Sequence, residues 1–207
     1  MSSDELAKLG SAYALEGTEQ VRALYRDWAA SYDTDFIGRM AYVLPKIVAE
    51  VFQRHGGAGP ILDVGCGSGA VGMELAGRRI DGLDLSPEML AVAVEKGVYT
   101  RLIEGDLLGR LPLEEGAYRG VVSAGTFTHG HVGPEALDAL IRVSAPEALF
   151  CLSVNAEHFA AQGFEAKLSD LKGRGEITAP LLEDHPIYEG DHERAGDRST
   201  VVVFRRR

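Results

Sequence analysis

The sequence is poor in cysteine and carries little positive charge. Its two cysteines, Cys66 and Cys151, cannot form a disulfide framework, so the sequence predicts a reducing compartment. Lys and Arg number 21 against 31 Asp and Glu, which gives a formal net charge of -10. A general nucleic-acid binder needs a basic face to displace counterions from phosphates. We therefore expect no nucleic-acid partner.

Long apolar runs are also missing. No stretch is apolar for 18 residues, and no basic segment followed by an apolar run opens the sequence, so we predict no membrane partner and a cytoplasmic location. With 207 residues and 45% hydrophobic content, the chain can bury a core without disulfides. We expect a single domain over 1–207, as a monomer or homodimer, with a helical cap (1–58), a cofactor-binding core (59–155) and a C-terminal part (156–207).

The most informative segment is residues 59–72, in which an apolar strand leads through a glycine cluster into a helix. The residues of 61–64 predict a short buried strand. Three glycines follow, Gly65, Gly67 and Gly69. They allow a tight turn and let a ligand lie against bare backbone. A helix expected over 68–76 would direct free N–H groups at that ligand. The glycine spacing also fits a dinucleotide site, so it does not choose between nucleotide cofactors.

Three aspartates lie at or near the ends of the predicted strands and narrow that choice. Asp63, two residues before the first glycine, would repel a pyrophosphate but suit a ligand with an ammonium and a sulfonium group. Asp84 closes the second predicted strand, 79–84, at a spacing suited to a ribose diol. Asp106 ends the third and could accept a proton from an adenine amino group, with the Leu107 N–H facing a ring nitrogen. Each could instead be structural: Asp63 as a turn cap, Asp84 as a helix-dipole partner, Asp106 as ordinary turn chemistry.

Strands and helices alternate along the rest of the core, which predicts a parallel sheet covered by helices on both faces. Ser86 and Pro87 predict the start of a helix as its N-cap and first helical position. Further strands are expected at 101–107, 118–124 and 148–154, with possible antiparallel ones at 186–189 and 200–204. Further helices are expected over 43–52, 134–144 and 157–172. Pro45 would lie in the first turn of the helix over 43–52 or at a kink in it.

Together these segments closely resemble the class I (Rossmann-like) S-adenosylmethionine-dependent methyltransferases. The likeness runs from about residue 25 to 154, and its core is 62–69, 84–90 and 105–107. It implies an α/β fold with a doubly wound, mostly parallel seven-stranded sheet, and S-adenosylmethionine as cofactor. The cofactor-binding residues it implies are Tyr25, Asp63, Gly65, Cys66, Gly67, Asp84, Leu85, Met89, Asp106, Leu107 and Ala124. Within the family, residues 122–137 look most like the methyltransferase-like group named for the Williams-Beuren critical region.

Candidates for the catalytic step lie at both ends of the likeness. Tyr32, in a Tyr-Asp pair similar to one that ends the cap helix of small-molecule methyltransferases, could close over the methionine end of the cofactor, although aromatic residues there could equally be core. His129 and His131 fall in the loop after the fourth strand, where either could take a proton from an acceptor or merely orient the loop. No third ligand accompanies them, so we expect no metal.

The predicted function is transfer of a methyl group, in line from the sulfonium, to a nucleophilic O, N, S or C atom of a small-molecule acceptor. S-adenosylhomocysteine would be the product. Two alternatives remain at this point. One is a module that binds S-adenosylmethionine without catalysis, since a fold and a cofactor site do not prove turnover. The other is a nicotinamide-dependent oxidoreductase, which shares the glycine spacing and the acid at the end of the second strand, although Asp63 and Asp106 argue against it.

Overall fold

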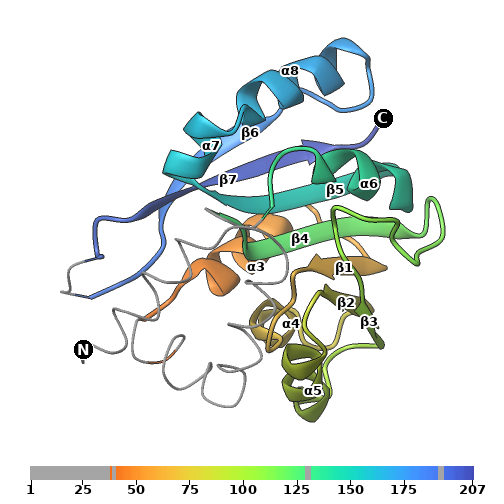
Figure 1. Cartoon of the computed structure of the whole chain (residues 1–207), viewed down its shortest axis with the longest axis vertical. Coiled ribbons are helices and arrows are strands. Elements are labelled where there is room, and N and C mark those ends of the chain that lie inside the picture. Colours follow the sequence, from red (N-terminus) through yellow and green to blue (C-terminus); the bar gives the residue numbers. More distant parts are fainter. Residues whose placement is uncertain (1–37, 39–40, 129–131, 191–193) are drawn as a thin grey trace.

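The structure, a computed structural model, describes residues 38, 41–128, 132–190 and 194–207. In these residues seven strands form one sheet in the order β3-β2-β1-β4-β5-β7-β6 (Figure 1). The strands are β1 (Ile61–Val64), β2 (Ile80–Asp84), β3 (Arg101–Glu104), β4 (Tyr118–Phe127), β5 (Ser144–Asn155), β6 (Leu181–Pro186) and β7 (Arg198–Arg205). The predicted α/β class with a seven-stranded sheet is confirmed.

The order of the strands determines where a ligand can bind. β1 pairs in parallel with β2 and β4, β2 with β3, and β4 with β5, whereas β7 is antiparallel to both β5 and β6. The chain thus builds β1 to β3 outward in one direction and then returns to place β4 on the other side of β1. In an open sheet of this kind, ligands bind beyond the carboxyl ends of the strands at such a reversal. The site is therefore expected just after β1 and β4.

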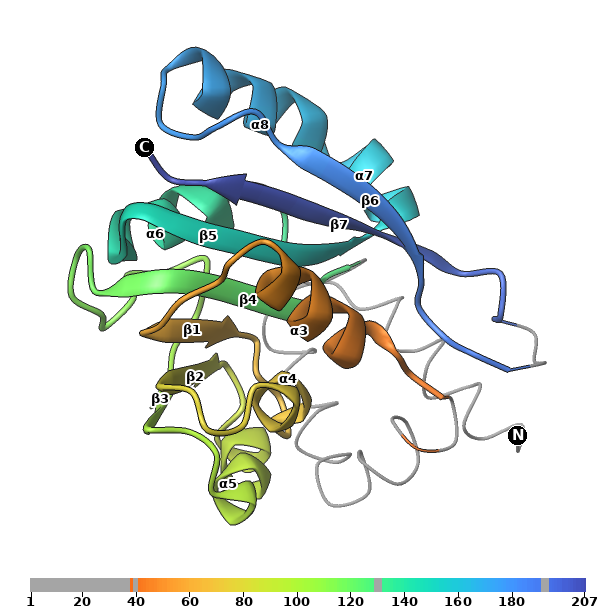
Figure 2. The same ribbon diagram turned by 180° about the vertical axis from the view of Figure 1, so that it is seen from behind.

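Helices cover both faces of the sheet, as the alternation of elements predicts. They are α3 (Leu44–Arg54), α4 (Ala70–Glu74), α5 (Pro87–Lys96), α6 (Ala136–Val143), α7 (Ala156–Ala161) and α8 (Phe164–Gly173). Side chains of α3 and α4 form one buried cluster with one face of the strands, and those of α6 and α8 form another with the opposite face. Figure 2 shows α3 in front of the sheet and α6 behind it.

Strand β1 lies inside the sheet, between β2 and β4, and contributes to both clusters. Ile61 packs toward α3 and α4, and Leu62 toward α6 and α8, and neither side chain is exposed. Burying each such side chain contributes about 1.5 to 3 kcal/mol. The glycine cluster that follows therefore starts from one of the most firmly held points of the fold.

Local sequence signals explain where several elements begin. The Ser86 hydroxyl accepts a hydrogen bond from the Met89 N–H at 3.2 Å, and Pro87 occupies the first helical position of α5, as predicted. Pro45 lies in the first turn of α3, where its missing N–H has no helical partner to lose. The helix consequently runs on to Arg54.

Three predicted elements differ from the structure. The helix expected over 68–76 is only α4, five residues long, because Gly69 at its N-cap has a left-handed φ of 95°. The helix expected over 157–172 is two helices, because Gly163, with φ 78°, starts α8 separately. The strand expected at 186–189 is instead β6, which ends at Pro186. β6 pairs along one side with β7 at the end of the strand order and exposes Leu181 and Leu182, so it shows no buried alternation.

The predicted division into a cap, a core and a C-terminal part stays a prediction. Most of the cap, residues 1–37 and 39–40, lies outside the described residues. Among the described helices, none is both long enough and apolar enough to span a bilayer.

Candidate cofactor site

The turn after β1 is built from three glycines in left-handed backbone conformations. Gly65, Gly67 and Gly69 have φ angles of 62°, 53° and 95°. The turn is held by two main-chain hydrogen bonds: the Cys66 N–H donates to Leu83 O at 3.0 Å, and the Gly69 N–H donates to Cys66 O at 2.8 Å. Residues with a Cβ rarely adopt this conformation. The sequence signal thus corresponds to a real backbone requirement.

Strand β4 closes on the first of these glycines. A Cβ on Gly65 would lie 2.0 Å from Thr126 Oγ1, so no side chain fits there. Thr126 Oγ1 and Ser123 Oγ both donate to Val64 O, at 2.9 and 2.7 Å. These bonds join the ends of β1 and β4, the two strands between which the strand order reverses.

Asp84, at the end of β2, ties the glycine turn to the start of α5. Its Oδ2 accepts the Gly67 N–H at 2.7 Å and its Oδ1 accepts the Ser86 N–H at 2.9 Å. Burial raises the pKa of this carboxyl, while the N–H groups of Ser86, Gly67 and Leu85 lower it. Each carboxylate oxygen can accept more than one hydrogen bond, so Asp84 can hold the turn and still accept hydrogen bonds from a ribose diol. Its structural and ligand-binding roles are compatible.

Asp63 is completely buried beneath the turn, with no exposed surface. Its Oδ2 accepts a hydrogen bond from the Tyr99 hydroxyl at 2.7 Å, whereas its Oδ1 is buried without a hydrogen-bond partner. Burial, and next the neighbouring charge of Asp84, raise the pKa of Asp63 to about 7, although the Tyr99 hydroxyl and the Gly72 N–H oppose the shift. A buried carboxyl with one oxygen unpaired would be stabilised in its charged form by a nearby cation.

Tyr99 is a residue of this site that the sequence reasoning missed. It lies between α5 and β3, and its ring fills the space that side chains at two glycines would need. A Cβ on Gly72 would lie 2.4 Å from Tyr99 Cζ, and one on Gly69 would lie 3.0 Å from Tyr99 Cε2. Because Tyr99 is 36 residues from Asp63, no local spacing could have linked them.

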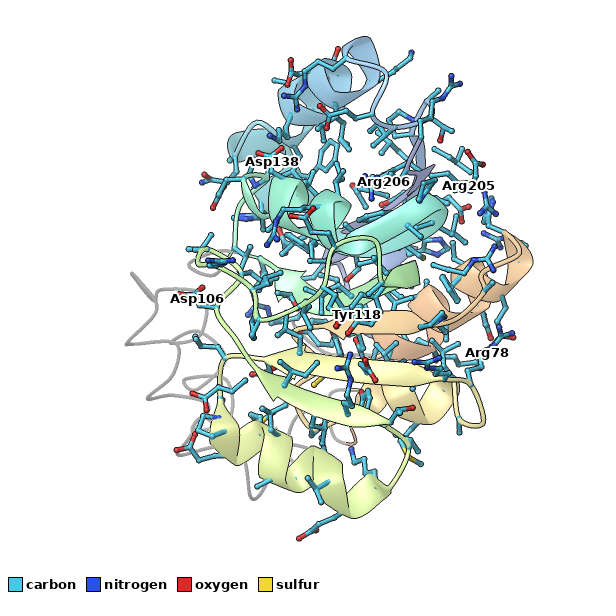
Figure 3. All side chains as sticks on the ribbon, turned by 90° about the vertical axis from the view of Figure 1, so that its right-hand side faces the viewer. Arg78, Asp106, Tyr118, Asp138, Arg205 and Arg206 are labelled. Carbon is cyan, nitrogen blue, oxygen red and sulfur yellow. The ribbon has the colours of Figure 1, made fainter. Side chains whose placement is uncertain are left out.

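Asp106 and Leu107 follow β3 at the same end of the sheet. Asp106 Oδ1 accepts the Leu108 N–H at 2.9 Å, a turn arrangement that the sequence left open as an alternative. The second carboxylate oxygen of Asp106 can still accept a hydrogen bond from an adenine amino group. The Leu107 side chain belongs to the buried cluster beneath α6 and α8, and Leu108 is exposed. Figure 3 places Asp106 at one end of the sheet and Arg78 and Arg205 at the other.

The remaining predicted contacts line or support the turn. The Cys66 side chain is buried, and burial raises the pKa of its thiol. Met89 is buried below the turn, with its Cε 3.3 Å from where a Cβ on Gly67 would lie. Leu85 is half-buried between Asp84 and the cap of α5, and Ala124 is half-buried on β4 beside the α3 cluster.

Tyr42, just before α3, is a second residue that sequence reasoning missed. A Cβ on Gly125 would lie 2.6 Å from its hydroxyl oxygen, so Tyr42 approaches β4 close to the predicted contact Ala124. Its ring packs against Tyr188 with the centroids 5.8 Å apart. Tyr42 thus brings the segment before α3 to the carboxyl end of β4.

Four predicted site residues lie outside the described ones: Tyr25, Tyr32, His129 and His131. Their roles stay predictions. Within the part of the chain that the structure describes, no group of three or more His, Cys, Asp or Glu side chains could hold a metal ion.

The described residues fit S-adenosylmethionine on two observations. The glycine turn offers bare backbone beside Asp84, whose oxygens can take further hydrogen bonds, and the buried Asp63 Oδ1 lacks a partner. Asp84 would hold the ribose, the turn would face the methionine end, and Asp63 would supply negative charge beneath it. A pyrophosphate would meet that charge unfavourably.

Comparisons with known proteins agree with this fit. Residues 61–147 match a family described as a methyltransferase domain. The chain is 45% identical over 65 residues to the 18S rRNA (guanine-N(7))-methyltransferase RID2 of Arabidopsis thaliana, covering 30% of this chain and 22% of that protein. It is 34% identical over 99 residues to the malonyl-[acyl-carrier protein] O-methyltransferase of Pectobacterium atrosepticum, covering 47% of this chain and 39% of that protein. The chain thus matches well under half the length of these relatives.

A solved structure shows the same fold over most of the chain. A SAM-dependent methyltransferase from Thermotoga maritima superimposes with a TM-score of 0.62 at 16% identity, covering 89% of this chain and 98% of that one. At this identity the likeness shows the fold. Residues 61–147 are thus similar to a methyltransferase domain, and most of the chain has the fold of a solved S-adenosylmethionine-dependent methyltransferase.

Proposed function

We propose that this protein transfers the methyl group of S-adenosylmethionine to a nucleophilic atom of a small-molecule acceptor. The observation that carries the proposal is the arrangement of Asp84 and the glycine turn. One carboxylate accepts N–H groups from both the turn and the start of α5, and thereby fixes two sides of a nucleoside site. The Methyltransferase domain match over 61–147 includes all of these residues.

Methyl transfer requires the protein mainly to position the acceptor. When bound, the cofactor supplies an electrophilic methyl group on a sulfonium. The protein would have to align the acceptor with the methyl–sulfur bond at about 3 Å and exclude water. Asp84 would fix the ribose and Asp63 would balance the positive charge at the methionine end. Tyr25 and Tyr32 would cover that end, where an aromatic face favours a cation.

A base is needed only if the acceptor carries a proton. We propose His129 and His131 for this role, because they follow β4 at the carboxyl end of the sheet. A histidine can take a proton near neutral pH. An oxygen or nitrogen acceptor would require one of them, whereas a thiolate or an activated carbon would not. The likeness of 122–137 to the Williams-Beuren group adds no acceptor to this proposal.

The small-molecule acceptor is supported by charge. The net charge of -10 disfavours a polyanion. The labelled basic residues Arg78 and Arg205 lie at the end of the sheet opposite Asp106 (Figure 3). They also donate to main-chain oxygens: Arg78 Nη1 to Gly57 O at 3.0 Å and Arg205 Nη2 to His55 O at 2.8 Å. These contacts are those of arginines that hold loops together.

RNA is the second candidate acceptor, because relatives in the matched region are named as 18S rRNA (guanine-N(7))-methyltransferases. An RNA would need contacts near Asp106, at the cofactor end of the sheet, rather than at Arg78 and Arg205. The expectation of no nucleic-acid partner is therefore tested directly, by offering RNA as an acceptor.

The test uses S-adenosylmethionine labelled in its methyl group. The protein is incubated with it and, in parallel, with a cell metabolite extract or with total cellular RNA, and labelled products are identified by mass spectrometry. Label in a small molecule supports the proposal, and label in RNA alone replaces its acceptor class. Binding of the cofactor with no label transferred in either arm would instead favour a non-catalytic module.

A further inference from the structure

The partly buried Tyr99 and the buried Asp63 form a pair next to the glycine turn, a pairing that the sequence motifs do not indicate. The Tyr99 hydroxyl donates to Asp63 Oδ2 at 2.7 Å, and the other oxygen of the carboxyl is buried and unpaired. A hydroxyl that donates to a carboxylate favours the charged form of that carboxylate. The Tyr99 hydroxyl therefore lowers the pKa of Asp63, against the larger effect of burial.

The ring of Tyr99 is fixed so that the hydroxyl must point at Asp63. Besides Gly69 and Gly72, it lies beside Gly82 on β2, where an added Cβ would be 3.2 Å from Tyr99 Cδ1. Side chains at these three glycines would displace the ring. Several of the glycines near the turn thus make room for this tyrosine as well as for a ligand.

The charged and titratable groups around Asp63 come from three elements. The charge of Asp84 on β2 raises the pKa of Asp63, and burial followed by both carboxylates raises the pKa of the Cys66 thiol in the turn. Lys96 of α5 reaches the turn from outside, with its Nζ 3.5 Å from Ser68 Oγ. α4 faces Asp63 with the Gly72 backbone, and β4 pairs it with the apolar Val122. Tyr99 is the group among these that stabilises the Asp63 charge directly through a side-chain hydrogen bond.

We propose that Tyr99 is a positioning residue of the cofactor site, whose hydroxyl holds Asp63 in the charged state that attracts the ammonium end of the cofactor. This inference rests on the proposed cofactor site. It adds that cofactor binding and ionisation of Asp63 are coupled. The cofactor binds more tightly as pH rises through the ionisation of Asp63, and the Tyr99 hydroxyl lowers the pH at which this occurs.

The experiment measures the affinity of S-adenosylhomocysteine by calorimetry at pH 6, 7, 8 and 8.5 for the wild-type protein and Tyr99→Phe. This substitution keeps the ring and removes the hydroxyl. Between pH 6 and pH 8 the wild-type affinity should rise about tenfold, as expected for an ionisation near neutrality. In Tyr99→Phe the midpoint should move up by about one pH unit, which makes binding about fivefold weaker at pH 7 but within about twofold at pH 8.5.

Tyr118→Phe is the matched control. Tyr118 is also buried and donates its hydroxyl to an aspartate, Asp81 Oδ2, at 2.9 Å, but Asp81 lies near the amino end of β2, away from the turn. Its pH profile should match that of the wild type. A second probe, 5′-methylthioadenosine, carries the adenosine without the ammonium, so its affinity should not shift in Tyr99→Phe.

The outcomes distinguish a failure of the proposed cofactor site from a failure of the proposed role of Tyr99. If the wild-type protein binds no S-adenosylhomocysteine at any pH, the proposed cofactor site itself fails. If it binds but Tyr99→Phe weakens binding equally at every pH, or leaves the profile unchanged, Tyr99 only packs and the inference alone is overturned. A shift that appears equally with 5′-methylthioadenosine also overturns it.

Discussion

Replacing Asp63 with Asn should remove a large pH dependence from the free energy of unfolding. In the folded protein the pKa of this carboxyl is raised from 3.8 to about 7, mainly by burial. Between these values the folded state keeps a proton that the unfolded state has released, so stability falls as pH rises. The stabilisation is fully present below the unfolded value and is lost as pH rises through about 7. Three pKa units correspond to about 4 kcal/mol in total, of which roughly 3 kcal/mol should disappear between pH 5 and pH 8.

The assay is urea unfolding of the ligand-free wild type and Asp63→Asn at pH 5, 6, 7 and 8. Asn can still accept the Tyr99 hydroxyl through its amide oxygen, so the packing is retained. Other groups titrate equally in both proteins, and the difference between the two curves isolates Asp63. Asp63→Asn should gain roughly 3 kcal/mol relative to wild type between pH 5 and pH 8. Parallel curves would refute the assignment of a buried Asp63 with a raised pKa.

Further variants test the site. Asp84→Ala should weaken S-adenosylmethionine by about 1 to 3 kcal/mol, the scale of charge-assisted hydrogen bonds, and unchanged affinity in calorimetry would remove Asp84 from the site. Gly65→Ala should lose about 2 to 4 kcal/mol in urea unfolding, from backbone strain plus a Cβ placed 2.0 Å from a hydroxyl oxygen. Gly77→Ala has a similar positive φ but nothing within 4 Å of the added Cβ, so it should lose only about 1 kcal/mol, and equal losses would contradict the clash. His129→Ala or His131→Ala should lower turnover with cofactor affinity nearly unchanged, whereas a loss of cofactor binding alone would place the altered histidine elsewhere.

Those parts of the fold that depend on local signals could be predicted from the sequence. Ser86 and Pro87 start α5 because a hydroxyl cap and a missing N–H act within one turn. The turn after β1 was predictable because its glycines share a backbone requirement. Gly163, which separates α7 from α8, was visible in the sequence, but the helix expected over 157–172 ran through it.

Contacts between distant segments could not be predicted in this way. The bond from Tyr99 to Asp63 depends on the pairing of β1, β2 and β3, which brings together residues without any sequence spacing in common. Tyr42 near Gly125 depends similarly on how α3 packs on β4. The position of β6 could not be predicted, because an exposed strand at one end of the strand order has no buried face and therefore no alternation of apolar and polar residues.

The most direct test of the account is calorimetric titration of the full chain with S-adenosylhomocysteine and, separately, with NAD⁺ at pH 8. A site with a buried carboxyl beneath a glycine turn and no tolerance for a pyrophosphate should bind S-adenosylhomocysteine and show no heat with NAD⁺. Binding of NAD⁺ without binding of S-adenosylhomocysteine would contradict the account at its centre.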